Sequence, residues 1–300
     1  MENKPQKIIV IVGQTSSGKS DLAVRLAKKF SGEVISADSR QVYKGLDIGT
    51  GKITKAEMKG VPHHLLDVAN PIRPYSVALY KKHATQSLRH IAKNGKLPII
   101  CGGTGFYIDT LLGAVSLPNV PANKNLRKIL SEKSKDELLA ILAIMDGERA
   151  RTIDGRNPAR LIRAIEIASA IGKVPKLNKQ ELKYDALKIG IKVESDDLKQ
   201  KIVTRLLSRI KKGMIEEAKS LHKKGLSFKR MDELGLEYRY LAKYLKGEMA
   251  EQEMIEKIKI ENWRYAKRQM TWFKRDKEIH WFTSDNLKNT DKIVMDFLKA

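Results

Sequence analysis

Short apolar runs and amphipathic stretches alternate along the first third of the chain. Three apolar runs, rich in β-branched residues, have the length of buried strands: residues 7–12, 33–37 and 97–101. Apolar residues recur at helical spacing in three further stretches: residues 21–30, 76–93 and about 105–112. Strands that alternate with helices in this way favour a parallel sheet covered by helices. We therefore predict an α/β fold with a doubly wound parallel sheet, and we expect loops at 45–51 and 61–75.

The remaining two thirds of the chain have mainly helical patterns. Residues 119–186 contain helical periods and no convincing strand, so we interpret them as a helical lobe inserted into the α/β core. The core would then comprise residues 1–118 and 187–300. Its second part begins with a predicted strand at 187–193 and contains another at 279–282. Three helices are predicted there: 198–221 as one long amphipathic helix, 251–275 and 287–298.

The loop after the first apolar run carries the first chemical signal. It matches the pattern G-x-x-x-x-G-K-[ST] between a predicted strand and a predicted helix, with the residues Gly13, Gln14, Thr15, Ser16, Ser17, Gly18, Lys19 and Ser20. In such P-loops the backbone amides and the helix N-terminus surround phosphate oxygens. The lysine adds a positive charge, and the hydroxyl of Ser20 can coordinate Mg²⁺. The sequence therefore predicts a P-loop NTPase-like core that binds a phosphate-bearing ligand.

Charge adds a second signal. The chain of 300 residues has a net charge of +23, and the excess of lysine and arginine is spread over all of its parts. Such a surface is typical of nucleic-acid-binding proteins, although a lysine-rich composition without that partner gives the same count. The single cysteine, Cys101, excludes a disulfide framework and a cysteine-based zinc module. With no signal-peptide pattern and no apolar run of about 18 residues, we expect a cytoplasmic protein without membrane contact.

An acidic residue at the end of a predicted strand limits the reactions that the P-loop could serve. A nucleotide hydrolase normally places a Mg²⁺-binding carboxylate after an apolar strand, but residues 97–101 are followed by the glycine-rich turn 102–105. Asp38 follows the run at 33–37 instead. Since ligands bind beyond the carboxyl ends of parallel strands, we expect Asp38 on the same sheet edge as the P-loop. By themselves, these residues allow a small-molecule kinase in which Asp38 is the base for an acceptor hydroxyl.

Longer motifs beyond the P-loop resemble a known family. They are, in chain order, DSRQVYKGLDIGT (38–50), PHHL (62–65), YSV (75–77), GGTGFY (102–107), NPARLIRA (157–164) and AKRQMTWF (266–273). Together with the P-loop, these motifs resemble bacterial tRNA dimethylallyltransferases, which are also called tRNA isopentenyltransferases. The resemblance extends over essentially the whole chain, and the block that begins at Asp38 is far more specific than the P-loop.

The resemblance implies transfer of a dimethylallyl group from dimethylallyl diphosphate to N6 of the adenosine 3′-adjacent to the anticodon of a tRNA. It implies that the P-loop binds the donor diphosphate, with Mg²⁺ near Ser20. Asp38 would be the general base, and Thr104 would touch the reacting centre. The partner would be the anticodon stem-loop, and we expect a monomer. The residues implied in tRNA binding are Asp38, Ser39, Arg40, Gln41, Thr104, Arg127, Ala159, Arg160, Leu161, Ile162, Arg163, Lys267, Arg268, Gln269, Trp272 and Lys274.

The chain departs from the family at a few positions, and other functions stay open. Ala159 stands where the family often has glutamine, and Val203 replaces an acidic position, which puts one polar contact to tRNA and one donor-side or structural contact in doubt. The alternatives are a small-molecule kinase, an adenylate isopentenyltransferase that acts on free AMP, and a basic RNA-binding protein with ATP as a ligand. The inserted basic lobe and the arginines of residues 264–275 favour tRNA, because a small acceptor needs neither.

Overall fold

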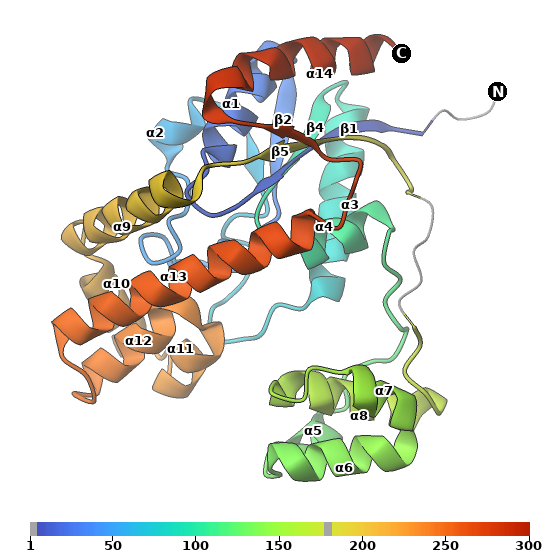
Figure 1. Cartoon of the computed structure of the whole chain (residues 1–300), viewed down its shortest axis with the longest axis vertical. Helices are drawn as coiled ribbons and strands as arrows, with labels where there is room; N and C mark the ends of the chain where they lie inside the picture. Colours follow the sequence, from blue (N-terminus) through green and yellow to red (C-terminus); the bar gives the residue numbers. More distant parts are fainter. Residues whose placement is uncertain (1–4, 177–181) are drawn as a thin grey trace. The chain divides into compact units, whose positions relative to one another are not determined.

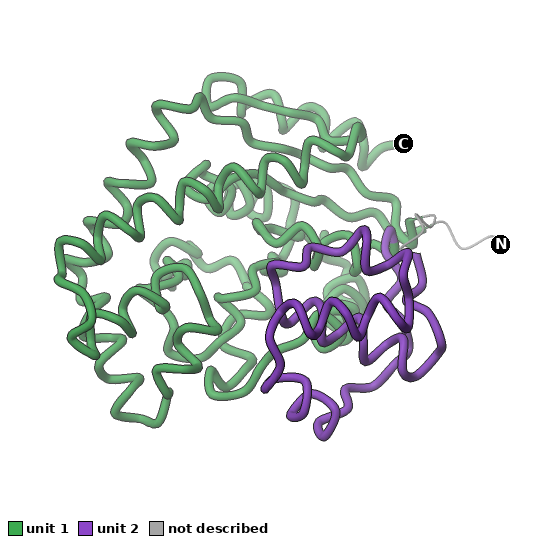
Figure 2. The backbone as a smooth tube through the Cα atoms, turned by 60° about the horizontal axis from the view of Figure 1, so that its bottom comes forward, with its two compact units in different colours: residues 1–113, 181–300 green, residues 114–180 purple. Residues whose placement is uncertain are grey.

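The computed structural model describes residues 5–176 and 182–300. The chain forms two compact units (Figure 2). Unit 1 contains residues 1–113 and 181–300, and unit 2 contains residues 114–180. The sequence suggested 119–186 for the insertion, whereas the strand β5 (Asp185–Ile191) already belongs to unit 1.

Unit 1 is built around one parallel sheet. Its six strands are β1 (Lys7–Gly13), β2 (Gly32–Ser36), β3 (His63–His64), β4 (Leu97–Cys101), β5 (Asp185–Ile191) and β6 (His280–Phe282). They lie in the order β3-β2-β4-β1-β5-β6, and all neighbouring pairs are parallel. The predicted α/β fold with a parallel sheet is confirmed. The short strand β3 was missed, because two histidines after a proline have no strand pattern.

Helices cover both faces of this sheet (Figure 1). On β1, Ile9 and Ile11 pack on one face, against α1 (Lys19–Lys29) and α14 (Thr290–Lys299). The alternate residues of β1 pack on the other face, against α3 (Val77–Lys93) and α4 (Gly105–Leu112). Because both faces are buried, the central strand is apolar throughout, which is why its sequence is a continuous run.

A helical part of unit 1 follows β5. It comprises α9 (Ser195–Lys211), α10 (Met214–Lys223), α11 (Phe228–Leu234), α12 (Leu236–Leu245) and α13 (Glu251–Phe273). The prediction of one long helix at 198–221 is wrong, because the chain breaks at Gly213, where φ is 94°. The apolar period continues across the break since Leu206 of α9 and Met214 of α10 pack in the same hydrophobic cluster. The helices α11 and α12 were not predicted. Two short elements complete the unit: α2 (Lys55–Met58) and the 3₁₀ helix η1 (Ser284–Asn289).

Unit 2 is helical in its described residues. Its helices are α5 (Lys124–Leu130), α6 (Lys135–Met145), α7 (Gly147–Thr152) and α8 (Pro158–Ile171). Each begins after a residue whose side chain accepts a hydrogen bond from a first-turn amide: Asn123, Ser134, Asp146 and Asn157. Leucines of α5, α6 and α8 form a small separate core. None of the helices in the described parts of either unit has the length and apolarity of a membrane span.

Candidate active site

Three strand ends meet at one edge of the sheet. The strands β2, β4 and β1 are consecutive neighbours, so their carboxyl ends bring Asp38, Thr104 and the P-loop to the same edge. Hydrogen bonds join these turns: the amide of Thr104 donates to the carbonyl of Ala37 (3.1 Å), and the amide of Ser39 donates to Thr104 Oγ1 (3.1 Å). Thr104 therefore holds the turn that carries Asp38.

The P-loop has the backbone geometry of an anion site. Gly13 has a φ of 145°, and a Cβ there would lie 2.7 Å from the carbonyl oxygen of Ile191, so only glycine fits. Gly18 is the N-cap of α1 with a φ of 88° and supplies no capping side chain. The first-turn amides of α1 consequently keep their donors available for an anion, with the positive end of the helix dipole behind them.

Lys19 lies half-buried at the start of α1, and its ammonium group points back to the loop. It donates hydrogen bonds to the carbonyl of Gln14 and to Ser17 Oγ, the latter at 3.5 Å. Burial lowers its pKa to about 8. A bound anion would replace these uncharged partners and favour the charged lysine.

Asp38 is oriented by its own backbone. Its Oδ1 accepts hydrogen bonds from the amides of Arg40 (2.8 Å) and Gln41 (3.2 Å), as in an Asx turn. Within the described parts of the chain, Oδ2 has no hydrogen-bond partner. The turn thus combines the capping role that is common for aspartate with a second oxygen that is free to accept a proton.

Arg205 of α9 completes this edge, and sequence analysis did not identify it. It donates a hydrogen bond to the carbonyl of Gly51 (2.8 Å), which also accepts one from Gln41 Nε2 (3.4 Å). Partial desolvation and the neighbouring Arg209 lower the pKa of Arg205, while the charge of Asp38 opposes this change. The charge of Arg205 in turn lowers the pKa of Lys19. Arg205 is thus a second cation whose charge acts on the P-loop lysine. An arginine at helical spacing in a basic chain gave no sequence signal.

A carboxylate of α10 holds the loop that contacts Arg205. Glu217 accepts hydrogen bonds from the amides of Asp47 (2.9 Å), Ile48 (2.7 Å) and Gly49 (2.9 Å), and from the hydroxyl of Tyr238 (2.6 Å). Arg209 binds the carbonyl of Gly49 at 2.8 Å. The glycine-rich loop predicted at 45–51 is therefore held firmly by the helical part of unit 1.

One face of α13 supports the site from inside. Gln269 is 5% exposed; its Oε1 accepts from the amide of Thr15 (2.7 Å), and its Nε2 donates to the carbonyl of Gly103 (3.0 Å). Trp272 donates to Asp109 Oδ2 at 3.0 Å and packs against Gly105, where a Cβ would lie 2.1 Å from its ring. Both residues were expected at tRNA, but in the structure their polar groups bind unit 1 itself.

Tyr265 of the same helix was not identified from the sequence. Burial, and after it the charge of Asp38, raise the pKa of Tyr265, so its hydroxyl stays protonated at neutral pH. A tyrosine within an arginine-rich segment gives no signal of its own.

The outer face of α13 is basic. Lys267, Arg268 and Lys274 are exposed. Lys267 lies over the ring of Trp263 (5.3 Å), and Arg268 lies over the ring of Tyr265 (5.9 Å). Cations interleaved with aromatic rings suit the phosphates and bases of RNA.

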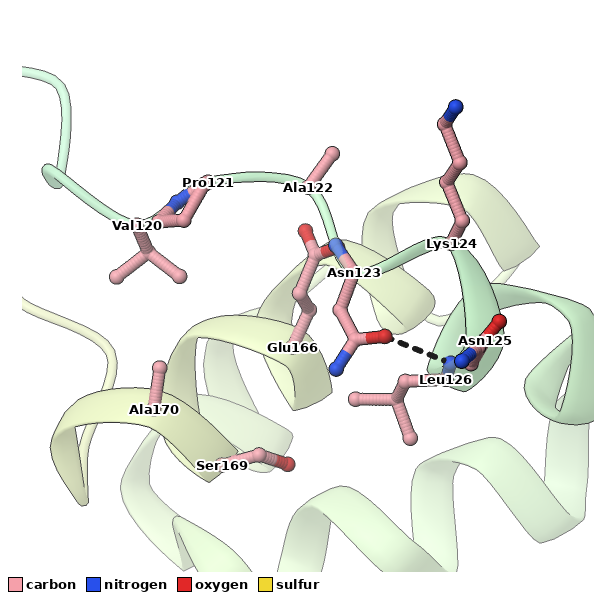
Figure 3. A pocket seen from close by; sticks show the side chains of 10 residues that line it. All are labelled: Val120, Pro121, Ala122, Asn123, Lys124, Asn125, Leu126, Glu166, Ser169 and Ala170. Carbon is pink, nitrogen blue, oxygen red and sulfur yellow. Dashed lines mark hydrogen bonds between the residues drawn. The ribbon is translucent and has the colours of Figure 1, made fainter.

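Unit 2 carries the other expected tRNA contacts, most of them on α8. Ala159 and Arg160 are exposed, and Ile162 is partly buried in the small core of this unit. Leu161 has no exposed surface. The Leu161 side chain fills the core of unit 2, so the predicted tRNA contact of this residue would have to come from its backbone. Arg127 and Arg163 both bind the carboxylate of Glu166. Glu166 also lines an open cavity of about 660 Å³ between α8 and residues 120–126 (Figure 3).

The residues near Ser20 fit a magnesium ion that also binds phosphate oxygens. The described residues contain no group of three histidine, cysteine or carboxylate side chains suited to a metal. Ser20 is exposed at the first turn of α1, next to the P-loop amides. Mg²⁺ is commonly held by few protein oxygens together with water and substrate phosphates, so a hydroxyl beside a phosphate site is a suitable donor set.

Comparison with known proteins places the chain among modifiers of tRNA. A model of the IPP transferase family matches residues 41–276. A tRNA dimethylallyltransferase of Pelotomaculum thermopropionicum is 36% identical over 306 residues, which cover 100% of this chain and 98% of the relative. The tRNA dimethylallyltransferase 2 of Treponema denticola is 43% identical over 272 residues, which cover 89% and 91%.

Solved structures of similar proteins cover nearly the whole chain. The full-length tRNA isopentenylpyrophosphate transferase of Bacillus halodurans matches with a TM-score of 0.74 and 34% identity, covering 98% of this chain and 97% of that one. A eukaryotic dimethylallyltransferase acting on tRNA matches with a TM-score of 0.78 and 26% identity, covering 93% and 74%.

Proposed function

We infer the reaction from one premise: this chain belongs to the IPP transferase family. It is a tRNA dimethylallyltransferase, and we propose that its acceptor is N6 of the adenosine 3′-adjacent to the anticodon. The observation that carries the mechanism is the position of Asp38, which its own turn holds on the same sheet edge as the P-loop. A base for the acceptor therefore lies beside a cradle for the leaving group.

The donor side consists of the P-loop and its cations. The amides that begin α1, together with Lys19, bind the diphosphate of dimethylallyl diphosphate, and Arg205 reaches it from α9. These groups stabilise the negative charge that develops as the diphosphate leaves. A Mg²⁺ ion held by Ser20 supplies further Lewis-acid charge when it is bound.

The acceptor side centres on Asp38. The N6 lone pair forms a bond to C1 of the dimethylallyl group while the C1–O bond breaks, and the bonding electrons leave with the diphosphate. Asp38 Oδ2 takes the proton that N6 loses, and such general-base catalysis contributes about 10²–10⁴-fold. The base must first leave the stacked loop, since chemistry on a nucleobase needs access to its edge.

Two basic surfaces bind the tRNA in this proposal. One is the outer face of α13, with Lys267, Arg268 and Lys274; the other is unit 2, with Arg160 and its neighbours. The net charge of +23 agrees with phosphate contacts along a stem. We also propose that the enzyme acts as a monomer in the cytoplasm, where unmodified tRNA is available.

The kinase alternative agrees less well with the site. The turn that follows β4 presents Thr104, whereas a nucleotide-dependent phosphoryl transfer normally needs a Mg²⁺-binding carboxylate at such a strand end. A small acceptor also leaves the two basic surfaces without a role. The same argument disfavours free AMP as the acceptor.

The test is direct. The purified protein is incubated with Mg²⁺, unmodified tRNA and labelled dimethylallyl diphosphate, and in parallel with AMP or ATP in place of one substrate. We expect label in the tRNA at the adenosine beside the anticodon and no turnover of ATP. Phosphoryl transfer, or prenylation of AMP but not of tRNA, would contradict the proposal.

A further inference from the structure

A buried carboxylate lies at the centre of the basic residues of unit 2. Glu166 of α8 is 2% exposed. It accepts hydrogen bonds from the amide of Asn123 (2.6 Å), from Arg127 Nε (2.9 Å) and Nη2 (2.8 Å), and from Arg163 Nη1. In Figure 3 its carboxylate points to the backbone of Asn123, at the start of α5. Two of the arginines expected to bind tRNA therefore share one acidic partner.

The two guanidinium groups are fixed but not hidden. The side chain of Arg127 is 45% exposed and that of Arg163 is 35% exposed, whereas the Glu166 side chain is 1% exposed. Arg163 is further tied to the carbonyl of Val120 at 2.8 Å. Arg127 uses only Nε and Nη2 for Glu166, and within the described part of the chain its Nη1 has no hydrogen-bond partner. The carboxylate thus holds both cations from the inside.

This arrangement has a physical cost that needs an explanation. A carboxylate leaves water only at a large penalty unless charged partners compensate it. Burial alone would raise the pKa of Glu166, but the hydrogen bonds from Arg127, Arg163 and Asn123 lower it to about 2. Glu166 is therefore ionised at neutral pH, where it pairs with the two arginines.

We propose that Glu166 is a positioning residue for tRNA, which orders Arg127 and Arg163 before the phosphates arrive. The inference rests on the proposed function of unit 2 as a tRNA-binding surface. A long arginine side chain loses rotamer freedom when it binds a phosphate, and an arginine that is already ordered avoids this loss. Glu166 itself is buried and does not touch the RNA.

The sign of the effect separates positioning from simple electrostatics. Glu166→Gln removes a negative charge from a basic surface, which by charge alone strengthens binding to RNA. If Glu166 orders the two arginines, the same change weakens binding, because glutamine cannot bind both guanidinium groups as a charged acceptor. The matched control is Glu148→Gln, which removes a carboxylate from the same unit at an exposed ion pair with Lys176.

The experiment measures steady-state prenylation with both substrates varied. For Glu166→Gln we expect a rise of about tenfold in the KM for tRNA, with kcat and the KM for dimethylallyl diphosphate unchanged. Glu148→Gln should leave the KM for tRNA unchanged or lower it. An unchanged or lowered KM for tRNA in Glu166→Gln would overturn the inference. If the wild-type enzyme does not prenylate tRNA, it is the proposed function that fails.

A double-mutant cycle guards against a general loss of structure. In an Arg127→Ala/Arg163→Ala background, Glu166→Gln should raise the KM for tRNA no further, because it acts through these two side chains. A further rise of equal size would show that Glu166 acts by another route and would overturn the inference. If Glu166→Gln unfolds unit 2, Arg163→Lys tests the same point, since it keeps the charge but loses the fixed guanidinium geometry; an unchanged KM for tRNA would then overturn it.

Discussion

Asp38 uses one carboxylate oxygen for structure and leaves the other for chemistry. Because an asparagine oxygen can accept the same bonds from Arg40 and Gln41, Asp38→Asn should preserve the turn and remove only the base. We expect kcat to fall about 10²–10⁴-fold, with tRNA affinity within about tenfold of wild type. Single-turnover prenylation and filter binding measure the two quantities. A parallel loss of affinity would instead make Asp38 a recognition residue.

The lowered pKa of Lys19 predicts that the affinity for dimethylallyl diphosphate depends on pH. Its pKa of about 8 lies below the usual value for lysine because burial disfavours the charge. An anionic diphosphate binds the charged form better and raises that pKa, so binding takes up a proton above pH 8. The affinity for an unreactive dimethylallyl diphosphate analogue should therefore be flat below pH 8 and fall above it.

Calorimetry in buffers of different ionisation enthalpy measures both the affinity and the proton uptake. Lys19→Arg is the control, because arginine remains charged over the whole range. If wild type and Lys19→Arg lose affinity in the same way above pH 8, another group is responsible.

At the scale of elements, α13 joins the chemistry to the RNA surface. Its inner face carries Gln269, which links Thr15 of the P-loop to Gly103 beyond β4, and its outer face carries the exposed Lys267 and Arg268. One helix thus combines two tasks, since its opposite faces point to different partners.

Gln269→Ala should therefore affect the donor more than the tRNA. The substitution removes two hydrogen bonds and leaves the Thr15 amide and the Gly103 carbonyl without partners. Each buried group without a partner lowers the free energy of unfolding by about 1–3 kcal/mol. We expect a higher KM for dimethylallyl diphosphate and a lower melting temperature. Lys267→Ala, on the outer face of the same helix, should raise only the KM for tRNA. If Gln269→Ala instead raised only the KM for tRNA, Gln269 would be a tRNA contact, as its motif implied.

For the whole molecule, charge governs the encounter with RNA. Each phosphate contact releases counterions, so the logarithm of the KM for tRNA should rise linearly with the logarithm of salt concentration. Lys274→Ala should weaken binding and reduce this slope by about 1. The control is Lys299→Ala at the end of α14. This end of the helix contacts Lys7, which begins β1, whereas the P-loop follows the other end of that strand. If both variants and the wild type had equal salt slopes, Lys274 at the end of α13 would not contact the tRNA phosphates.

The parallel sheet, the P-loop and the position of Asp38 could all be predicted from the sequence. Those features depend on local chemistry: strands buried on both faces are apolar throughout, glycines permit the loop, and parallel strands end at one edge. The charged residues that contact these site loops, and the ion cluster of unit 2, became known only from the tertiary structure. Arg205 and Glu217 contact residues distant in the chain, and Glu166 contacts Asn123 and Arg127 as well as the nearby Arg163. A single charged residue in a helix pattern does not reveal such distant partners. The helix break at Gly213 was not predicted, because α9 and α10 pack on one hydrophobic cluster and share one apolar period.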